Sequence, residues 1–214
     1  MDEKIAQLLD KGMAQMPIMS SESEEERSNH KQQLLKLVKM LAKWNKAFNL
    51  TAIREPQEMV IRHILDSLSI APYLVGERLL DVGSGAGLPG LPLAIIFPEK
   101  QFTLLDSNGK KTRFITQARS ELGLTNVDVV QSRVEDFTSE PYSTITARAF
   151  SSLAGIINTT RHLLAEKGRL LLMKGVFPEE ELRQIPAGFM LQEALELNVP
   201  MLEAERHLII LKQK

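Results

Sequence analysis

The residues with the clearest chemical meaning form a glycine-rich segment between Asp81 and Gly90. It reads Asp-Val-Gly-Ser-Gly-Ala-Gly-Leu-Pro-Gly and follows directly on a short apolar run that begins at Arg78. Glycines let a backbone turn sharply and approach a ligand closely, and the helix expected after the loop offers free N–H groups. A strand, a glycine loop and a helix in this order predict a nucleoside-cofactor site.

Two cofactors fit this loop. Gly85-Ala-Gly87-Leu-Pro-Gly90 matches the fingerprint of NAD-binding proteins. S-adenosylmethionine is favoured because Asp81 suits a sulfonium and an ammonium better than a pyrophosphate. The glycines from Gly83 to Gly87 also recur at every second residue, a spacing that resembles methyltransferase loops. Finally, about 80 residues precede the loop, whereas a dinucleotide domain usually opens its chain.

Acidic residues after the next two apolar runs extend the same site. Asp106 ends the second run, where a carboxylate can accept hydrogen bonds from ribose hydroxyls. Both cofactors contain ribose, so Asp106 supports the site without choosing between them. It also fits the N-cap of the following helix. Glu135 and Asp136 follow the third run, at a position that would face the adenine.

Missing residues narrow the methyl acceptor. The chain has no cysteine, which closes the covalent route to carbon 5 of pyrimidines. After the fourth apolar run the sequence reads Thr146-Ala-Arg-Ala-Phe150, without the Asp/Asn-Pro-Pro-aromatic motif that holds exocyclic amines. A ring nitrogen such as guanine N7 is already nucleophilic and needs only positioning. No catalytic residue is therefore predicted.

Basic residues near the site are candidates for binding a polyanion. The net charge is −1, but residues 1–30 hold three basic and seven acidic residues, whereas residues 31–63 hold seven basic and two acidic ones. This asymmetry permits a local basic face or simply a solvated helix. Arg148 is expected at the mouth of the site, where it pairs with a cofactor carboxylate or a phosphate, or is merely exposed. The candidate contacts to such a polyanion, RNA included, are Lys43, Lys46, His63, Lys174 and Arg206.

Two residue pairs in the N-terminal part favour structural roles. Trp44 and Phe48 share a helical face, which is more typical of a core than of base stacking. His63 and Asp66 lie three residues apart, and this spacing favours a structural hydrogen bond over a catalytic dyad.

Composition places the chain among soluble globular proteins. It has 214 residues, of which 43% are hydrophobic and 25% charged, as in an ordinary folded domain. No apolar run approaches the roughly 18 residues that span a bilayer, and the N-terminus lacks the features of a secretory signal. Without cysteine, neither disulfides nor a zinc ribbon can form, and no metal site is predicted. A cytoplasmic protein is expected.

The periodicity predicts a helical extension at residues 1–75 and one compact α/β unit at residues 76–214. Ser23 and Glu26 match a capping box, and apolar residues spaced by three and four follow them. The second part alternates short apolar runs with helical segments, including one at 153–165, which predicts a parallel sheet covered on both faces. Residues 190–199 and 206–212 predict a closing antiparallel hairpin.

Several further segments complete a resemblance to a known family. The chain resembles the bacterial glucose-inhibited division protein B (RsmG) family, which methylates guanine N7 in small-subunit ribosomal RNA. The resemblance runs from about Leu34 to the end of the chain. The matching segments are 44–51, 62–67, 81–90, 104–111, 131–135, 148–150 and 205–208.

The resemblance implies a seven-stranded Rossmann-like methyltransferase fold, S-adenosyl-L-methionine as the cofactor and 16S rRNA of the small ribosomal subunit as the partner. It also agrees with the absence of a defined catalytic residue. We expect a monomer. The cofactor contacts that it implies are Gly83, Leu88, Val134, Glu135 and Arg148, with Asp106 as a further contact.

Three rival hypotheses remain at this point. The first is a methyltransferase that acts on another RNA, a protein or a small molecule. The second is an NAD-dependent oxidoreductase, which the glycine spacing permits. The third is a non-catalytic RNA or cell-division partner, against which the intact loop glycines argue.

Overall fold

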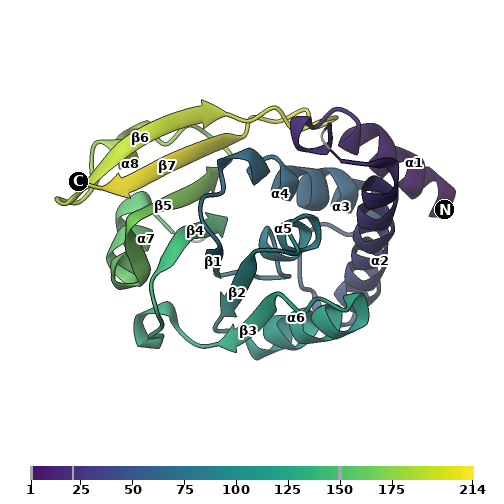
Figure 1. The fold of residues 1–214 in the computed structure, drawn as a ribbon, viewed down its shortest axis with the longest axis horizontal. Helices are drawn as coiled ribbons and strands as arrows, with labels where there is room; N and C mark the ends of the chain where they lie inside the picture. The colour runs from purple at the N-terminus through teal and green to yellow at the C-terminus, as the bar shows by residue number, and fades with distance from the viewer. Residues whose placement is uncertain (1, 21, 149–150) are drawn as a thin grey trace.

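Seven strands form one sheet at the centre of the molecule (Figure 1). The computed structural model describes residues 2–20, 22–148 and 151–214. The strand order is β3-β2-β1-β4-β5-β7-β6; β1 to β5 are parallel, and β7 is antiparallel to its neighbours β5 and β6. The predicted seven-stranded, mostly parallel sheet with an antiparallel C-terminal hairpin is confirmed. The strands are β1 Arg78–Val82, β2 Gln101–Asp106, β3 Val127–Gln131, β4 Tyr142–Arg148, β5 Leu164–Lys174, β6 Phe189–Glu196 and β7 His207–Gln213.

Helices precede the sheet and connect its strands. They are α1 Asp2–Met13, α2 Glu24–Phe48, α3 Pro56–Met59, α4 Asp66–Leu68, α5 Gly90–Ile96, α6 Gly109–Leu122, α7 Leu153–Thr160 and α8 Glu179–Leu182. Short 3-10 turns lie at Pro17–Met19, Ala71–Tyr73, Val134–Asp136 and Arg161–Leu163. Between α3 and α4 the chain continues as the π-helix Val60–Leu65. Such wide turns are frequent at functional sites. Among the described residues, no helix is both long and apolar enough to cross a membrane.

Side chains along the strands alternate between two hydrophobic cores. Leu79 and Leu104 belong to the larger core, which residues of α1 to α6 complete. Their neighbours Leu80 and Leu105 point to the other face and join the smaller core with α7. In Figure 1, α7 and α8 lie on the side of the molecule opposite α1 and α2. Burial of both faces explains why these strands are continuous apolar runs.

The N-terminal helical segment begins as predicted but differs at its end. Ser23 Oγ accepts a hydrogen bond from Glu26 N, and the Glu26 carboxylate accepts one from Ser23 N, which is the predicted capping box. Trp44 packs edge-on against Phe114 of α6, partly buried. The core position predicted for Phe48 is wrong. It is 44% exposed because it is the last residue of α2, beyond the packed face of the helix.

The helix after β4 is shorter than predicted. The pattern predicted a helix over 153–165, but α7 ends at Thr160 and β5 already begins at Leu164. Leu164 pairs with Tyr142 of β4, and the register shifts between Tyr142 and Thr144. Sheet pairing thus recruits residues whose local pattern favours helix.

Asn126 supports the end of α5 and gives a test of the fold. Its buried side-chain Nδ2 lies 3.0 Å from the carbonyl oxygens of Ala94 and Phe97 and 3.1 Å from that of Lys100. We expect Asn126→Ala to lower the free energy of unfolding by about 1–3 kcal/mol, because the buried carbonyl of Ala94 and two partly buried carbonyls lose this donor. Urea denaturation measures this loss. Asn29→Ala, at an exposed position of α2, should change stability by less than about 0.5 kcal/mol; equal effects would contradict this role.

Candidate cofactor and substrate sites

The glycine loop leaves β1 at its carboxyl end and bends back toward β2. Gly83 and Gly85 have φ values of +66° and +60°, in the left-handed region that favours glycine. Gly83 N donates a hydrogen bond of 2.8 Å to Leu105 O in the neighbouring strand. The loop is therefore fixed to the sheet, and its backbone borders the pocket described below.

Asp81 lies beneath the loop and does not line the pocket described in the next paragraph. Its Oδ2 accepts a hydrogen bond from Gly90 N at 3.0 Å, and its Oδ1 accepts one from Thr146 Oγ1 at 3.1 Å. Burial raises the pKa of this carboxyl to about 6, against the opposing hydrogen bonds. Asp81 thus ties the start of α5 to β4, and its role toward the cationic groups of a cofactor stays a prediction. A carboxylate here also disfavours a pyrophosphate at this helix.

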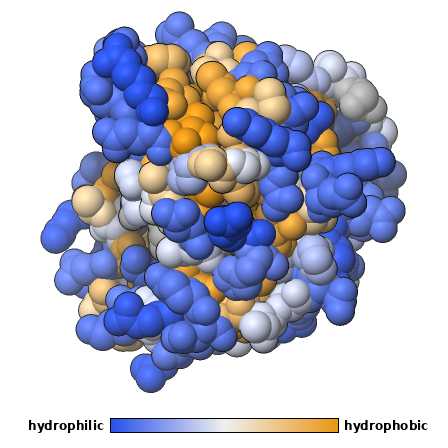
Figure 2. Space-filling model, turned by 90° about the vertical axis from the view of Figure 1, so that its left-hand side faces the viewer, coloured by the Kyte–Doolittle hydropathy of each residue, from blue (hydrophilic) through white to orange (hydrophobic). Residues whose placement is uncertain are grey.

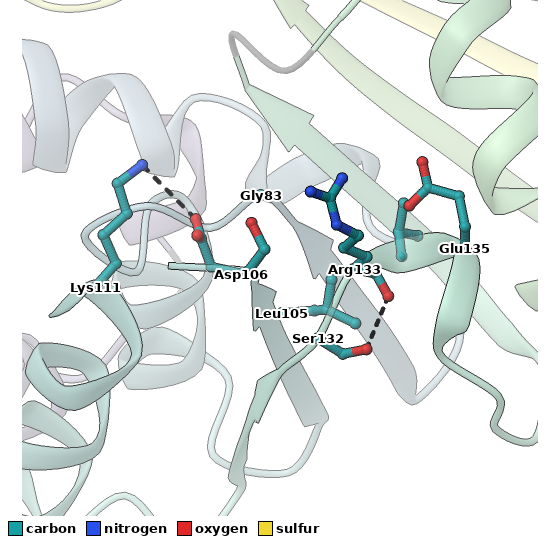
Figure 3. Close-up of a pocket in the computed structure, with 9 residues that line it drawn as sticks. Gly83, Leu105, Asp106, Lys111, Ser132, Arg133 and Glu135 are labelled. Carbon is teal, nitrogen blue, oxygen red and sulfur yellow. Dashed lines mark hydrogen bonds and ion pairs between the residues drawn. The ribbon is translucent and has the colours of Figure 1, made fainter. Parts of the chain in front are cut away.

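A pocket of about 350 Å³ lies at the carboxyl ends of β1, β2 and β3. It is lined by Gly83, Leu105, Asp106, Ser107, Lys111, Ser132, Arg133, Val134 and Glu135; we call it the nucleoside pocket. Figure 3 shows Asp106 beside Lys111, and Ser132, Arg133 and Glu135 across the pocket from Lys111. The pocket is concave and contains a few polar groups in fixed positions, as small-molecule sites do.

Asp106 is held in place by backbone groups on both sides. Its Oδ2 accepts a hydrogen bond from Gly85 N, and its Oδ1 accepts one from Asn108 N, each at 2.8 Å. Lys111 Nζ lies 3.8 Å from Oδ2. Asn108, and not Asp106, caps α6 through a hydrogen bond from Lys110 N. The carboxylate is thus oriented at the pocket wall and free of the capping role.

Some of the predicted cofactor residues line the nucleoside pocket, and the others lie elsewhere. Gly83, Asp106, Val134 and Glu135 line it together. Leu88 is buried in the larger core, and Arg148 lines a second pocket. Ala149 and Phe150, which also carry the resemblance, lie outside the described residues.

The second pocket, of about 390 Å³, lies where the N-terminal helices meet β4, β5 and β7. We call it the arginine pocket. Its lining residues are Ile53, Arg62, His63, Asp66, Arg148, Met173, Lys174, Gly175 and Arg206. Sequence reasoning named four of these residues as candidate site residues but assigned Asp66 no part in the site.

Asp66 is the centre of the arginine pocket. Its side chain is almost fully buried, and its two oxygens take different partners: Oδ2 accepts from Arg148 Nη1 at 3.0 Å, and Oδ1 accepts from Arg206 Nε at 2.8 Å. The pairing orients both guanidinium groups at the pocket wall. The partners are 82 and 140 residues away in sequence, so no local pattern could have revealed this role.

His63 is uncharged at neutral pH. Burial, reinforced by the nearby charge of Arg148, lowers its pKa to about 4. Nδ1 lies 3.1 Å from Arg62 O, so this nitrogen carries the proton, and Nε2 accepts a hydrogen bond from Thr51 Oγ1 at 2.9 Å. The hydrogen bond predicted between His63 and Asp66 is replaced by these contacts, because Asp66 turns toward the two arginines.

The remaining candidate RNA contacts lie at different distances from the arginine pocket. Lys174 lines it and forms an ion pair with Glu181 at 2.9 Å. Lys43 and Lys46 are exposed on the last turns of α2 and are not among the lining residues. The C-terminal end of α2 is nevertheless linked to this region, because Asn45 Nδ2 donates a hydrogen bond to Ile53 O at 2.9 Å.

The two pockets flank one place in the sheet. Val82, just before Gly83, pairs with Ala147, just before Arg148. In the sheet, β1 lies between β2 and β4. The strand order runs outward from β1 through β2 to β3 and then reverses, because β4 lies on the opposite side of β1. Ligands of open α/β sheets bind at such a reversal of strand order, beyond the carboxyl ends of the strands. A ligand that crosses this point can reach both pockets. The described residues contain no cluster suited to a metal ion.

The strand order distinguishes a methyltransferase from a dinucleotide-binding protein. Dinucleotide-binding sheets have the parallel order 3-2-1-4-5-6, whereas here β7 inserts antiparallel between β5 and β6. This is the sheet of a Rossmann-like methyltransferase. The glycopeptide N-methyltransferase MtfA, solved with S-adenosylhomocysteine, matches this fold with a TM-score of 0.61 at 12% identity, over 71% of this chain and 87% of its own.

Sequence comparison identifies the family within this class. The model of the family described as rRNA small subunit methyltransferase G matches residues 30–209. Proteins named ribosomal RNA small subunit methyltransferase G are similar to this chain. The one from Serratia proteamaculans is 56% identical over 85% of this chain and 89% of its own length. The one from Pseudomonas aeruginosa (strain LESB58) is 56% identical over 87% and 88%. The chain belongs to the rRNA small subunit methyltransferase G family, as its motifs predicted.

The buried carboxyl of Asp81 gives a test of the site electrostatics. Because its pKa rises from 3.8 to about 6 on folding, the folded state keeps the proton at pH values where the unfolded state has lost it. Stability from this group is therefore present below about pH 4 and is lost as the pH rises through 6, by about 3 kcal/mol. The unfolding free energy of the wild type, relative to that of Asp81→Asn, should therefore fall by about this amount from pH 3 to pH 7. A pH-independent difference would contradict the assignment.

Proposed function

We propose that this chain transfers a methyl group from S-adenosyl-L-methionine to N7 of a guanine in 16S rRNA of the small ribosomal subunit. The observation that carries the proposal is the pair of pockets at the β1–β4 reversal. One has a carboxylate suited to a ribose, and the other is lined by arginines. Family membership supplies the reaction class, and the residues below supply the geometry.

The nucleoside pocket supports a binding mode for the cofactor. Asp106, oriented by Gly85 N and Asn108 N, would accept hydrogen bonds from the ribose hydroxyls. Val134 and Glu135 form the wall after β3, where a backbone N–H and a carboxylate would recognise the adenine edge. Gly83 would border the methionine part, which points toward β4.

Leu88 and Arg148 remain proposed cofactor contacts, although neither lines the nucleoside pocket. Arg148 follows Ala147, the sheet partner of Val82, so its guanidinium lies on the far side of the reversal. Asp66 uses Nη1, and the other donors would be available to the cofactor carboxylate. Leu88 lies in the loop itself and would contribute through its packing.

The chemistry requires little from the protein beyond positioning. Bound S-adenosylmethionine supplies an electrophilic methyl group on a sulfonium. In an in-line displacement the lone pair of guanine N7 forms the new N–C bond, the S–C bond breaks, and its electron pair stays on sulfur. N7 carries no proton in the neutral base, so no general base is needed. This agrees with a site that lacks an obvious catalytic residue, and it makes alignment of the two reactants the main task.

The arginine pocket supports binding of the guanine and its phosphates. Arg206 and Lys174 would contact the RNA backbone. The neutral His63 keeps both ring nitrogens bonded to Arg62 O and Thr51 Oγ1, so it would contact the nucleotide through packing of its ring and add no charge. Lys43 and Lys46 would extend the contact along α2. Planar guanidinium groups suit both phosphate and guanine recognition. No residue is proposed as catalytic, and no metal is required.

The wider setting follows from this substrate. Because the proposed substrate is ribosomal RNA, we propose that the protein works in the cytoplasm of a bacterial cell. We propose that residues 1–75 act as a helical extension of the catalytic unit 76–214, because both contribute to one core and to the arginine pocket. We also propose a monomer, since the exposed large apolar side chains are spread over α2, β6 and the loop after β5.

Nucleotide mapping of 16S rRNA tests the reaction and its target. In a strain that lacks this protein, one guanine should lose its N7 methyl group, and the purified protein with S-adenosylmethionine should restore it. Transfer to other bases, or to protein or small molecules without RNA, would refute the proposed acceptor. Binding of NAD but not of S-adenosylhomocysteine in calorimetry would refute the cofactor.

Asp106 provides a sharper test of the cofactor site. We expect Asp106→Asn to weaken S-adenosylhomocysteine binding by about tenfold or more, because a charged hydrogen-bond acceptor for the ribose is lost. Isothermal titration calorimetry measures this Kd. Asp128→Asn makes the same chemical change at an exposed position of β3 and should leave the Kd unaltered. If both variants bind as the wild type does, the ribose does not lie at Asp106.

A further inference from the structure

The loop after β5 exposes an aromatic ring that the proposed function has not used. Val176 and Phe177 are 75% and 44% exposed, although the strand before them is largely buried. They follow Lys174 and Gly175, which line the arginine pocket. The side of the molecule that carries α7, α8 and the C-terminal hairpin is shown in Figure 2, where hydrophobic residues lie between hydrophilic ones. Exposed aromatic rings at the border of a pocket favour recognition of a flat ligand.

The Phe177 ring is supported from one side by His207. The two ring centroids lie 5.5 Å apart with planes inclined by 73°, an edge-to-face contact. His207 begins β7 and pairs with Lys174 in the sheet, and its Nδ1 lies 3.4 Å from Gly175 O. The histidine is therefore fixed by the sheet and limits the positions that the phenylalanine ring can take.

The loop itself is held at both ends. Lys174 forms its ion pair with Glu181 across the loop, and Glu181 Oε2 also accepts a hydrogen bond from Leu153 N at 2.6 Å. Glu179 N donates to Phe177 O at 3.1 Å, and Pro178 restricts the backbone of Phe177. A ring held in this way loses little conformational entropy when a ligand stacks on it.

The neighbouring charges indicate what would stack there. Arg206 precedes His207 in the chain, and Lys174 is the sheet partner of His207, so two basic residues adjoin the residues of the ring pair. Basic side chains beside an exposed aromatic ring are an arrangement by which proteins bind unpaired nucleotides. Moreover, N7 of a guanine within an A-form helix faces a deep, narrow groove that side chains cannot enter. A guanine that reacts at N7 would therefore lie outside a regular helix, and a neighbouring base would lose a stacking partner when this guanine enters the pocket.

We propose that Phe177, supported by His207, is a stacking platform for the RNA base adjacent to the methylated guanine. This rests on the proposed function, because it places the target guanine in the arginine pocket. The platform would replace the stacking that the neighbouring base loses when the guanine enters the pocket, and it would fix the register of the RNA strand.

Substitutions of Phe177 test the proposal with 16S rRNA from a strain that lacks this protein. Phe177→Ala should raise KM for the RNA by about tenfold, as expected for loss of one stacked base, with little change in kcat. Phe177→Leu keeps apolar area but has no ring face, and it should resemble Phe177→Ala. Phe177→Trp should restore a KM near that of the wild type. Binding of S-adenosylhomocysteine, measured by calorimetry, should be equal in all four proteins.

A matched control uses the opposite end of the same hairpin. Met190 is 40% exposed. It pairs with Lys212 near one end of the β6–β7 ladder, whereas His207 pairs with Glu196 at the other end. Met190→Ala should leave the RNA KM unchanged. The proposal is overturned if Phe177→Ala has the KM of the wild type, or if Phe177→Leu behaves like the wild type, because simple apolar contact would then suffice.

A direct binding measurement separates this proposal from the proposed function. A short single-stranded RNA with one guanine next to 2-aminopurine should show quenched fluorescence on titration with the wild-type protein and with Phe177→Trp, but not with Phe177→Ala. If the wild type methylates no rRNA, the proposed function fails, and this titration still tests the platform. Equal quenching by the wild type and Phe177→Ala refutes the platform even where methylation occurs.

Discussion

One buried carboxylate, that of Asp66, connects the parts of the structure on which the site depends. It belongs to the helical segment before the sheet, and it pairs with Arg148 at the end of β4 and with Arg206 before β7. Removing one partner from a buried ion pair costs several kcal/mol because the remaining charge is left uncompensated. The pairing therefore fixes the helical extension, the centre of the sheet and the C-terminal hairpin around a single pocket.

A second buried carboxylate has a different task, and the contrast shows how environment sets the role of an acid. Asp81 accepts hydrogen bonds from Gly90 N and Thr146 Oγ1 and faces no cation directly, and burial raises its pKa to about 6. Asp106 also accepts two backbone hydrogen bonds, but it lines a pocket. Of these two acids, Asp106 lines the nucleoside pocket and Asp81 does not.

Short sequence patterns predicted those structural features that are formed by residues close together in the chain. The capping box at Ser23, the glycine loop after β1 and the hairpin at the end of the chain all follow from short patterns, and the structure contains each of them. Contacts between distant segments could not be read in this way. The Asp66 pairs join residues more than 80 positions apart, and the early start of β5 depends on pairing with β4. The exposure of Phe48 reflects where a helix face ends, which periodicity alone does not mark.

The ion pairs of the arginine pocket also set its net charge, and hence the salt dependence of the RNA binding proposed there. Four cationic side chains line the pocket, and three carboxylates already pair with them: Glu58 with Arg62, Asp66 with Arg148 and Arg206, and Glu181 with Lys174. The salt dependence of nucleic-acid binding arises when protein cations neutralise phosphates and release their counterions. A cation that is already paired with a carboxylate neutralises a phosphate less, so fewer counterions are released. The pocket thus offers many oriented donors at a small net charge. The proposed RNA would therefore be recognised there by hydrogen-bond geometry more than by bulk attraction, so the pocket would distinguish ligands of equal charge by their shape.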